Sequence, residues 1–506
     1  MNLPIIYVAS AGCGKSTTLL NHLEEALEET TPETIIFTTF TNAGAKEAAE
    51  RARVRFPNYD EAQFRYFRTL HSLAYRNIPN RKMMGFGDYI ELGKQLGLHI
   101  NASRALSSTD GAINRDFSKG DLLLHLDSLM RSRRWTINQA VQNQEATFFS
   151  YDEINDFTTA YRSFRRQSSR YDFTDQLELF LENIDNWNPP LTHLFVDECQ
   201  DLSTLQWEII RKLSGKVGAT VIAGDDKQSI YGFSGGDPDT LIQLEGTRRI
   251  LETSYRLPSN ILGFSETVAS RIMNKQDYTV SPNGEGGEVE NIKNLYEIED
   301  ELAEGTWFLL VRNRKFLQTF EYQLDQLGIL YESDSGNGLI TPSLLECVKA
   351  WIELMKGFHV SAAVVKRIYS MYLRGDTVAH GFKKRLLSID DDESLSRDSL
   401  VDEHGLQNTR EWHNAFTLPK GVIEALKRIE ERGELDAGVR IRIATIHGVK
   451  GKEADNVVIL PDMAFLTHRA FGSDPDSEHR VFYVGVTRAK QRLFLHAPLT
   501  DKHYQL

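Results

Sequence analysis

The chain has 506 residues with a formal net charge of −13, and 41% of its residues are hydrophobic and 25% are charged. The length predicts roughly two to four domains, because one hydrophobic core stops growing before this size, and the lack of long apolar runs excludes a membrane-spanning protein. The three cysteines exclude a disulfide framework and a zinc site, and the acidic charge argues weakly against a nonspecific nucleic-acid binder, since a basic groove can lie within an acidic shell.

A phosphate-binding loop is predicted close to the start of the chain. Residues 5–8 predict a short buried strand and residues 16–26 predict a helix. The sequence between them matches G-x-x-x-x-G-K-[ST] except at its first position, which is Ala9. Glycines let backbone N–H groups surround phosphate oxygens, Lys15 adds positive charge, and the Ser16 hydroxyl suits Mg²⁺. The alternative is a chance match in a loop. The predicted nucleotide-binding residues of this loop are Ala9, Ser10, Ala11, Gly12, Cys13, Gly14, Lys15, Ser16 and Thr17.

A second strand and helix follow, at residues 34–42 and 43–53, which makes the pattern typical of a doubly wound α/β fold. Ligands of such sheets bind at the carboxyl ends of the strands, so Phe40, Thr41 and Asn42 are expected on the same edge as Lys15. Core packing is an equally good interpretation of Phe40. A third strand is predicted over 65–71. It would place Thr69 and His71 at its exit, although a single histidine is more often an ordinary surface residue.

Residues 79–168 show helical patterns without a clear strand and are predicted to form a helical insertion. The insertion carries basic residues at Arg131, Arg133 and Arg134, and again at Arg162, Arg165 and Arg166. The second group has i, i+3, i+4 spacing, which would align it on one helix face. A solvated basic face and a contact with a phosphate backbone are both open interpretations.

Two adjacent carboxylates end the next predicted strand, which covers 192–196. Asp197 is the expected ligand of the Mg²⁺ shell, and Glu198 is the expected group that orients and deprotonates an attacking water. Carboxylates after a strand are also common helix caps, but a phosphate loop earlier in the chain favours the catalytic interpretation. A further strand is predicted over 219–223.

Along most of its length the chain resembles the UvrD/Rep/PcrA group of superfamily 1 DNA helicases. The resemblance rests on an ordered set of motifs along most of the chain rather than on any one of them. The motifs are ASAGCGKST, TTFTNAGAKEAAERA, TLHSLAYR, YDFTDQLELF, FVDECQDL, VIAGDDKQSIYGF, LETSYRLPSNI, FLLVRNRKFLQTFEYQLDQLGILYE, IRIATIHGVKGKEADNVVIL and VFYVGVTRAKQRLFL.

The resemblance implies roles for residues that spacing alone leaves open. It implies that Tyr255 stacks on the base, Glu453 contacts the ribose and Arg256 meets the γ-phosphate of ATP. It makes Gln228 a sensor of the γ-phosphate and Arg488 an arginine finger, a group that can be worth roughly 10³–10⁵ in rate. The implied catalytic set is Lys15, Glu198, Gln228, Arg256 and Arg488, with ATP and Mg²⁺ as cofactors and with Ser16 and Asp197 as metal ligands.

For DNA the resemblance implies stacking and backbone contacts. Bases are expected to stack on Phe40, Tyr231 and Phe233. Backbone contacts are expected from Thr41, Asn42, His71, Thr445 and His447.

The resemblance also implies an α/β fold with two RecA-like P-loop motor domains, each a parallel sheet flanked by helices and each with a helix-rich insertion. Strands of the second motor domain are predicted at 305–311, 439–444, 456–460 and 492–496. The expected domains are 1A at 1–78 and 169–257, 1B at 79–168, 2A at 258–335 and 437–506, and a short 2B at 336–436.

Three departures from the family pattern bear on nucleotide and DNA use. The family places a glutamine-containing segment before the loop and an arginine after Lys-[ST], where this chain has few residues and Thr17, respectively. We therefore expect a relaxed preference between ATP and GTP. The family's Trp-Arg pair in the DNA-facing loop is Phe233-Ser234, which keeps a stacking face and loses a charge.

Together these features predict a DNA-stimulated ATPase that translocates 3′→5′ on single-stranded DNA and separates duplex ahead of it, with junctions of single- and double-stranded DNA as partners. Replication, repair, recombination and phage-related DNA metabolism are all open as its setting. The alternative is an ATP-gated DNA-binding subunit that regulates a partner nuclease or replication protein without processive unwinding. A P-loop kinase or GTPase would not explain the late VGVTRA motif. With no secretory signal recognised, we expect a cytoplasmic protein with no membrane partner.

Overall fold

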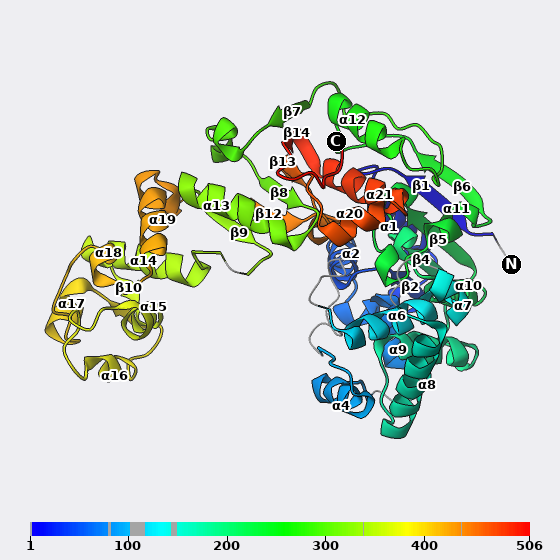
Figure 1. The fold of residues 1–506 in the computed structure, drawn as a ribbon, viewed down its shortest axis with the longest axis horizontal. Helices are drawn as coiled ribbons and strands as arrows, with labels where there is room; N and C mark the ends of the chain where they lie inside the picture. Colours follow the sequence, from blue (N-terminus) through cyan, green and yellow to red (C-terminus); the bar gives the residue numbers. More distant parts are fainter. Residues whose placement is uncertain (1–2, 79–81, 102–116, 143–148, 337, 437) are drawn as a thin grey trace. The chain divides into compact units, whose positions relative to one another are not determined.

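The computed structural model of the protein describes residues 3–78, 82–101, 117–142, 149–336, 338–436 and 438–506 (Figure 1). The chain folds as two compact units. The first comprises Met1–Asn291, Leu310–Arg314 and Thr445–Leu506, and the second comprises Ile292–Leu309 and Lys315–Ala444. The domain boundaries that we predict at 79 and 437 fall outside the described residues, and the four-part division stays a prediction.

The first unit contains a six-stranded sheet with the order β3-β2-β4-β5-β1-β6. Its neighbouring strands pair in parallel throughout. The strands are β1 (Ile5–Ala9), β2 (Ile35–Thr38), β3 (Phe67–Arg68), β4 (His193–Val196), β5 (Ala219–Gly224) and β6 (Thr247–Leu251). The predicted α/β class is confirmed. The edge strand β6 was not predicted, because four of its five residues are exposed and it lacks the apolar run of a buried strand.

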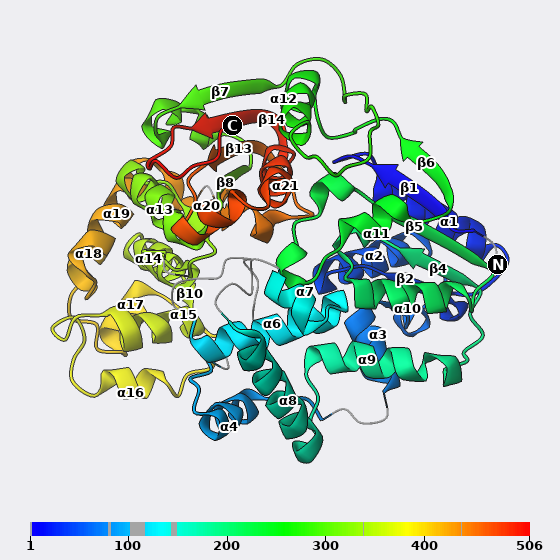
Figure 2. The ribbon, with the colours of Figure 1, turned by 45° about the vertical axis from the view of Figure 1, so that its right-hand side comes forward.

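Alternate residues of the central strands enter two separate cores, one on each face of the sheet. On one face Phe37, Phe195 and Val221 pack against α1 (Lys15–Leu27) and α2 (Asn42–Arg55). On the other face the strands pack against α3 (Leu70–Asn77), α9 (Phe173–Asn183) and α10 (Thr204–Ser214), which lie together on one side of the sheet in Figure 2. Helices on both faces of a parallel sheet are the doubly wound arrangement that the sequence predicts.

The third predicted strand, over 65–71, is wrong except at Phe67 and Arg68. The strand β3 covers only Phe67–Arg68, and Thr69 is the N-cap of α3, where its hydroxyl accepts a hydrogen bond from the N–H of Ser72 over 3.2 Å. His71 therefore lies in the first turn of α3 rather than at the exit of a strand. A threonine that can cap a helix competes with strand extension, and here the helix prevails.

As predicted, the described parts of residues 79–168 form helices joined by short irregular segments, and these helices are α4 (Phe86–Leu96), α6 (Lys119–Arg133), α7 (Ile137–Gln142) and α8 (Tyr151–Ser168). These helices have a core of their own, in which Tyr89, Leu126 and Phe157 are buried. Apart from an isolated bridge between Met83 and Tyr171, no strand pairing occurs in the described part of this insertion.

Neither interpretation of the basic residues holds for Arg131 and Arg165. Arg131 on α6 donates to Asp172 over 2.7 Å, and Arg165 on α8 forms ion pairs with Asp172 and Asp175 at the start of α9. Both arginines are largely shielded from solvent, whereas Arg162 and Arg166 are exposed. The arginines of α8 therefore do not share one exposed face, because carboxylates from α9 draw one of them into the interior.

A second six-stranded sheet has the order β7-β14-β13-β8-β12-β9. Within the first unit β13 and β14 pair in parallel, and within the second unit β12 and β9 do so. The strands are β7 (Glu288–Ile292), β8 (Trp307–Val311), β9 (Tyr331–Ser333), β12 (Ile441–Thr445), β13 (Ala454–Leu460) and β14 (Ala489–His496). The four predicted strands are present, while β7 and β9 were missed because they are short and mostly exposed or half-buried.

The remaining elements are mainly helices. In the first unit they are α11 (Pro238–Gln243), α12 (Ser259–Ala269), α20 (Phe465–Phe471) and α21 (Pro475–Val486). In the second unit they are α13 (Leu317–Leu327), α14 (Pro342–Met355), α15 (Ala362–Arg367), α16 (Phe382–Leu386), α17 (Arg397–Asp402), α18 (Trp412–Ala415) and α19 (Lys420–Glu431). A two-stranded antiparallel pairing of β10 (Val360–Ser361) with β11 (Ser394–Leu395) accompanies them and was not predicted.

The helices of the second unit surround a separate core in which Trp351, Tyr369 and Trp412 are buried. Among the described residues, no helix combines the length and the apolar composition that a membrane crossing needs.

Candidate active site

The loop after β1 has the backbone geometry of a phosphate cradle. Gly12 and Gly14 adopt the left-handed conformation, with φ of 74° and 77°. A Cβ atom at Gly12 would lie 2.4 Å from Cβ of Arg256, so a side chain there would force the backbone apart. Gly14 is the N-cap of α1, and the first N–H groups of a helix point along its axis toward an anion.

The first position of the loop does not need a glycine in this protein. Ala9 is the last residue of β1, is fully buried and lies beside Leu251 of β6 in the sheet. Extended backbone is open to any residue, and the small side chain fits. The following residues tie the loop to its surroundings, because the Ser10 hydroxyl lies 2.6 Å from the Tyr483 hydroxyl of α21 and the Ala11 carbonyl accepts from the Ser254 hydroxyl over 2.9 Å.

The loop side chains also differ in exposure. Cys13 is buried, and burial raises the pKa of its thiol to about 11. Thr17 is exposed on the first turn of α1.

Lys15 and two carboxylates face each other where α1 begins and β4 ends. Burial alone would lower the pKa of Lys15, but the charges of Glu198, Asp225 and Asp197 hold it above its ordinary value. The Ser16 hydroxyl donates to Oδ2 of Asp197 over 2.6 Å. Burial and the charge of Glu198 raise the pKa of Asp197 to about 6. The lysine is thus held as a cation inside a negatively charged site.

Cations from distant parts of the chain act electrostatically on Glu198. It adopts a left-handed backbone conformation with φ of 51°, which is uncommon for a residue with a side chain and frequent at functional sites. Burial would raise the pKa of its carboxyl, but Lys15 and Lys450, with a smaller effect of Arg488, hold it below its ordinary value. Glu198 is therefore ionised, as a general base must be.

The residues at this point suit Mg²⁺. A hydroxyl and a carboxylate oxygen already lie 2.6 Å apart in Ser16 and Asp197, and hard oxygen ligands are those that Mg²⁺ prefers. Over the described part of the chain no group of three or more His, Cys, Asp or Glu side chains converges as a metal cage. Mg²⁺ in nucleotide sites takes few protein ligands and completes its shell with phosphate and water, so this donor set fits it.

Arg488 approaches the same site from the segment between α21 and β14. Its side chain is 1% exposed, and its Nη2 donates to Oε1 of Gln228 over 2.9 Å. Gln228 in turn donates from Nε2 to Oδ2 of Asp225 over 2.6 Å. The other hydrogen bonds of Arg488 go to the carbonyls of Val484 and Lys452 and to the Thr487 hydroxyl.

Among the residues that the structure describes, no carboxylate is in direct contact with Arg488, since all these acceptors are uncharged. Burial and the nearby charge of Arg256 lower the pKa of Arg488 to about 9. A buried cation in this situation favours the arrival of an anion.

The residues expected to hold the base and ribose lie at the rim of the site. Tyr255 is 70% exposed, and its ring lies over the backbone of Gly14, where a Cβ atom would be 3.7 Å from the ring carbon Cε2. Arg256 donates from Nε to Oε2 of Glu453 over 2.6 Å and from Nη1 to the carbonyl of Thr487 over 3.3 Å. Arg256, the predicted γ-phosphate contact, and Glu453, the predicted ribose contact, thus form an ion pair with each other in this structure.

The predicted stacking residues form one aromatic cluster. Phe40 and Tyr231 stack with ring centres 4.8 Å apart and an interplanar angle of 25°. The ring of Phe233 lies 5.9 Å from Tyr231, and the His447 ring lies 5.9 Å from Phe233 and 6.2 Å from Tyr231. Phe40 and Tyr231, two of the predicted stacking residues, therefore contact each other.

The other predicted DNA contacts differ in their accessibility. Thr41 and Asn42 are exposed, and the Thr41 hydroxyl caps α2 by accepting from the N–H of Gly44 over 3.0 Å. Thr445 is buried, and its hydroxyl accepts from the N–H of Gly448 over 3.2 Å. His71 is half-buried with its ring 6.3 Å from that of Phe173, and burial lowers its pKa to about 4. His71 is therefore neutral near pH 7.

Lys450 joins the nucleotide side of the site to the aromatic cluster, and sequence reasoning did not single it out. Its Nζ donates to the carbonyl of Gln228 over 2.7 Å, forms an ion pair with Asp201 and lies 5.0 Å from the ring centre of Tyr231. The signal in the sequence was a lysine three residues after His447, but only the fold brings it to Asp201.

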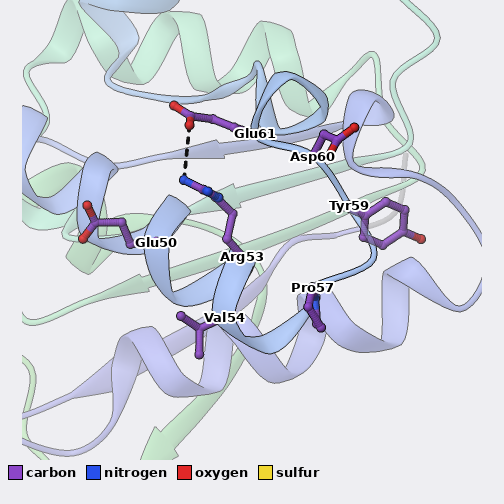
Figure 3. A pocket seen from close by; sticks show the side chains of 7 residues that line it. All are labelled: Glu50, Arg53, Val54, Pro57, Tyr59, Asp60 and Glu61. Atoms are coloured by element: carbon purple, nitrogen blue, oxygen red, sulfur yellow. Dashed lines mark hydrogen bonds and ion pairs between the residues drawn. The ribbon is translucent and has the colours of Figure 1, made fainter.

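A pocket of about 620 Å³ lies elsewhere in the first unit, at the carboxyl-terminal end of α2 and the segment after it (Figure 3). It is lined by Glu50, Arg53, Val54, Pro57, Tyr59, Asp60 and Glu61, and none of these is a predicted site residue. Arg53 and Glu61 pair across it over 3.2 Å.

Two family models match this chain. The model described as the UvrD/REP helicase N-terminal domain matches residues 1–248, and the model described as the UvrD-like helicase C-terminal domain matches residues 407–498. The chain belongs to the UvrD/Rep helicase family. The first match includes the phosphate loop and both carboxylates, and the second includes Arg488.

The individual relatives of this chain are distant in sequence. The ATP-dependent DNA helicase PcrA of Staphylococcus epidermidis is 26% identical over a region covering 52% of this chain and 38% of that protein. PcrA of Leuconostoc citreum is 24% identical, with 68% of this chain and 47% of that protein covered. A probable DNA helicase II homolog of Rickettsia felis is 23% identical, with 99% of this chain and 91% of that protein covered. The chain thus spans less than half the length of these PcrA relatives.

Proposed function

We propose that this UvrD-like helicase hydrolyses ATP to move along single-stranded DNA. The observation that carries the proposal is the position of Glu198. Its ionised carboxylate lies within electrostatic reach of Lys15, which follows β1, and of Arg488, which precedes β14. A water-activating carboxylate between two cations from distant segments suits the cleavage of a phosphate held by both.

In this proposal the loop and its lysine bind the phosphates. Ser16 and Asp197 hold Mg²⁺, which neutralises phosphate charge when bound. Glu198 orients and deprotonates the attacking water, and Arg488 supplies charge to the transferred phosphoryl group. Gln228 already contacts Arg488 at 2.9 Å, which supports its role as a γ-phosphate sensor. Tyr255, with its exposed ring over Gly14, stacks on the base.

Arg256 and Glu453 change partners in this proposal. Their 2.6 Å ion pair opens when nucleotide enters, which frees the guanidinium for the γ-phosphate and the carboxylate for the ribose. The cost of separating the pair is offset by the two new contacts.

The aromatic cluster is the proposed DNA platform. Bases stack on Phe40, Tyr231 and Phe233, and Thr41, Asn42, His71, Thr445 and His447 lie along the backbone path. Lys450 supports a link between the two functions, because it contacts both the Gln228 carbonyl and the Tyr231 ring. A change at Gln228 after hydrolysis would then alter, through Lys450, the surroundings of the Tyr231 ring on which a base stacks.

The proposed direction is 3′→5′ with unwinding at junctions of single- and double-stranded DNA, in replication, repair, recombination or phage-related metabolism. The direction follows from the resemblance of the motifs to UvrD. The names of the PcrA and helicase II relatives support a DNA helicase as the general activity.

Strand displacement with 3′-tailed, 5′-tailed and blunt duplexes tests this function. We expect ATP-dependent release of the strand from the 3′-tailed duplex only, and no release by Lys15→Ala, which keeps the fold but loses the phosphate contact. Release from the 5′-tailed duplex alone would reverse the direction. ATP-sensitive DNA binding without any release would instead identify the accessory subunit.

A further inference from the structure

The turn that carries Tyr231 and Phe233 is held by the helical insertion. This turn is the short helix η7 (Gly232–Ser234) with its flanking residues. The side chain of Arg133, the last residue of α6, donates from Nη2 to the carbonyl of Gly232 over 3.1 Å and to the carbonyl of Gly236 over 2.9 Å. One guanidinium group thus bridges the two ends of the turn.

The turn and the end of α6 are also in tight van der Waals contact. Gly235 has φ of 98°, and a Cβ atom there would lie 2.8 Å from Cβ of Ser132 and 3.3 Å from Cβ of Ser203. Gly236 forms an isolated bridge with Ser203. No larger residue fits at Gly235 without separating the turn from α6, so the insertion and the turn form one packed element.

Arg133 is engaged with the protein rather than with solvent. The centre of its guanidinium lies 5.0 Å from the ring centre of Trp135. Its Nε is buried and has no hydrogen-bond partner within the described ranges, and its two hydrogen bonds go to main-chain carbonyls. The role that the basic cluster suggested, a solvated face or a phosphate contact, does not describe this side chain.

The turn has its own hydrogen bonds, but they fix only its local shape. The N–H groups of Ser234 and Gly236 donate to the carbonyl of Tyr231 over 3.0 Å in each case, and the N–H of Gly235 donates to Gly232 over 2.9 Å. The turn is joined to its surroundings by the contacts of Gly235 with Ser132 and of Gly236 with Ser203, and by the N–H of Asp237, which donates to the carbonyl of Leu202 over 3.0 Å. The Arg133 side chain adds the contact that links both ends of the turn to α6.

We propose that Arg133 is a positioning residue for DNA binding: it fixes the turn so that Tyr231 and Phe233 present their rings to the bases. The inference rests on the proposed function of these two aromatic residues. A platform ordered in advance binds more tightly, because DNA does not have to restrict the turn on arrival. Arg133 does so through the two glycine carbonyls and without touching the DNA.

The test compares Arg133→Ala and Arg133→Lys with Arg162→Ala. The lysine retains a donor and the charge but cannot reproduce the fork of a guanidinium. Arg162 is an exposed arginine on α8 of the same insertion, so its removal takes away the same charge without touching the turn. Thermal unfolding of each variant checks that the insertion stays folded.

The first measurement needs no DNA. Hydrogen exchange of the segment 231–237 in the free protein reports the order of the turn itself, and we expect faster exchange in Arg133→Ala, intermediate exchange in Arg133→Lys and no change in Arg162→Ala. Unchanged exchange in Arg133→Ala would overturn the proposal whatever the protein does with DNA.

The second measurement uses single-stranded DNA containing 2-aminopurine, whose fluorescence changes on stacking, together with the DNA dependence of ATP hydrolysis. We expect Arg133→Ala to raise the DNA concentration at half-maximal ATPase stimulation about tenfold, with the maximal rate regained at saturating DNA. Arg133→Lys should fall between this variant and the wild type. An equal loss in Arg162→Ala would show that the insertion acts by charge and would overturn the proposal.

Failure of the proposed function can be distinguished from failure of the proposal for Arg133. If the wild-type protein neither binds DNA nor responds to it, the proposed function fails, while the exchange experiment still decides whether Arg133 orders the turn.

Discussion

Arg488 donates a hydrogen bond from Nη2 to Oε1 of Gln228 over 2.9 Å, although the two residues are 260 positions apart in the sequence. Gln228 is held on its other side by Asp225 and lies beside Lys450 through its carbonyl. The buried guanidinium therefore contacts a residue whose carbonyl accepts a hydrogen bond from Lys450, and Lys450 in turn lies 5.0 Å from the ring centre of Tyr231. This relationship gives a physical route by which a phosphate bound at Arg488 alters the surroundings of Tyr231.

Replacing Arg488 with alanine should reduce the rate of DNA-stimulated ATP hydrolysis by about 10³–10⁵, because the charge that stabilises the transferred phosphoryl group is lost. Lys15→Ala should be similarly inactive through loss of the phosphate contact. Both variants should keep their affinity for single-stranded DNA within severalfold, which fluorescence anisotropy measures. Arg469→Ala, on the exposed face of α20, serves as the control. Hydrolysis by Arg488→Ala at the wild-type rate would remove this residue from the active site.

Gly12→Ala should abolish nucleotide binding, whereas Ala9→Gly should preserve it. The new methyl group at Gly12 would sit 2.4 Å from Cβ of Arg256 in a left-handed backbone, while Ala9 lies in the regular strand β1. We expect Ala9→Gly to cost only about 1 kcal/mol of folding stability, as glycine does in a strand. Titration with a fluorescent ATP analogue measures binding, and calorimetry measures stability. Loss of binding in Ala9→Gly would instead mean that this position shapes the phosphate cradle.

Phe40→Ala should weaken the binding of single-stranded DNA by about 1–3 kcal/mol, the range for loss of one aromatic base platform. The same change also removes the 4.8 Å stacking partner of Tyr231, so part of the loss comes from a freer tyrosine ring. Equilibrium binding to a labelled oligonucleotide measures the effect. Phe86→Ala, at an exposed phenylalanine of α4, is the matched control. If the two variants bind equally well, Phe40 belongs to the core and not to the DNA platform.

Asp127→Asn should stabilise the protein relative to the wild type, increasingly as the pH rises from the pKa of an unfolded aspartate, about 4, to the folded pKa of about 6. Burial raises the pKa of Asp127 to about 6 despite Arg131 and Arg165, and the neighbouring Asp172 and Glu178 add negative charge. The folded state therefore resists ionisation of Asp127 more than the unfolded state does, so the wild-type protein loses stability between the unfolded and the folded pKa.

Between pH 5 and pH 8 we expect the difference in unfolding free energy to shift by about 1–2 kcal/mol in favour of Asp127→Asn. Calorimetric unfolding at both values measures this shift. Asp156→Asn on the exposed face of α8 removes the same charge and should show no such trend. A pH-independent difference for Asp127→Asn would mean that Arg131 keeps the carboxylate ionised throughout.

Local signals in the sequence were enough to predict the nucleotide half of the site. A strand, a glycine loop and a helix are neighbours along the chain, so the cradle around Lys15 follows from short-range sterics, and the apolar run before Asp197 marks a buried strand in the same way. The boundaries of the strands and helices were less predictable. Thr69, for example, can end a strand or cap a helix, and only its hydrogen bond with Ser72 shows that it caps the helix.

The sequence by itself therefore determined the family, the parallel α/β architecture and the glycine loop that joins β1 to α1 at Lys15, since each of these depends on contacts between near neighbours or on ordered motifs. Only the tertiary structure decided which distant side chains meet. It pairs Arg256 with Glu453 and Arg131 and Arg165 with carboxylates. It also directs Arg133 to the carbonyls of Gly232 and Gly236. Which charged groups pair depends on how deeply they are buried and on how far apart they lie in the folded chain. The spacing of residues along the sequence gives neither quantity.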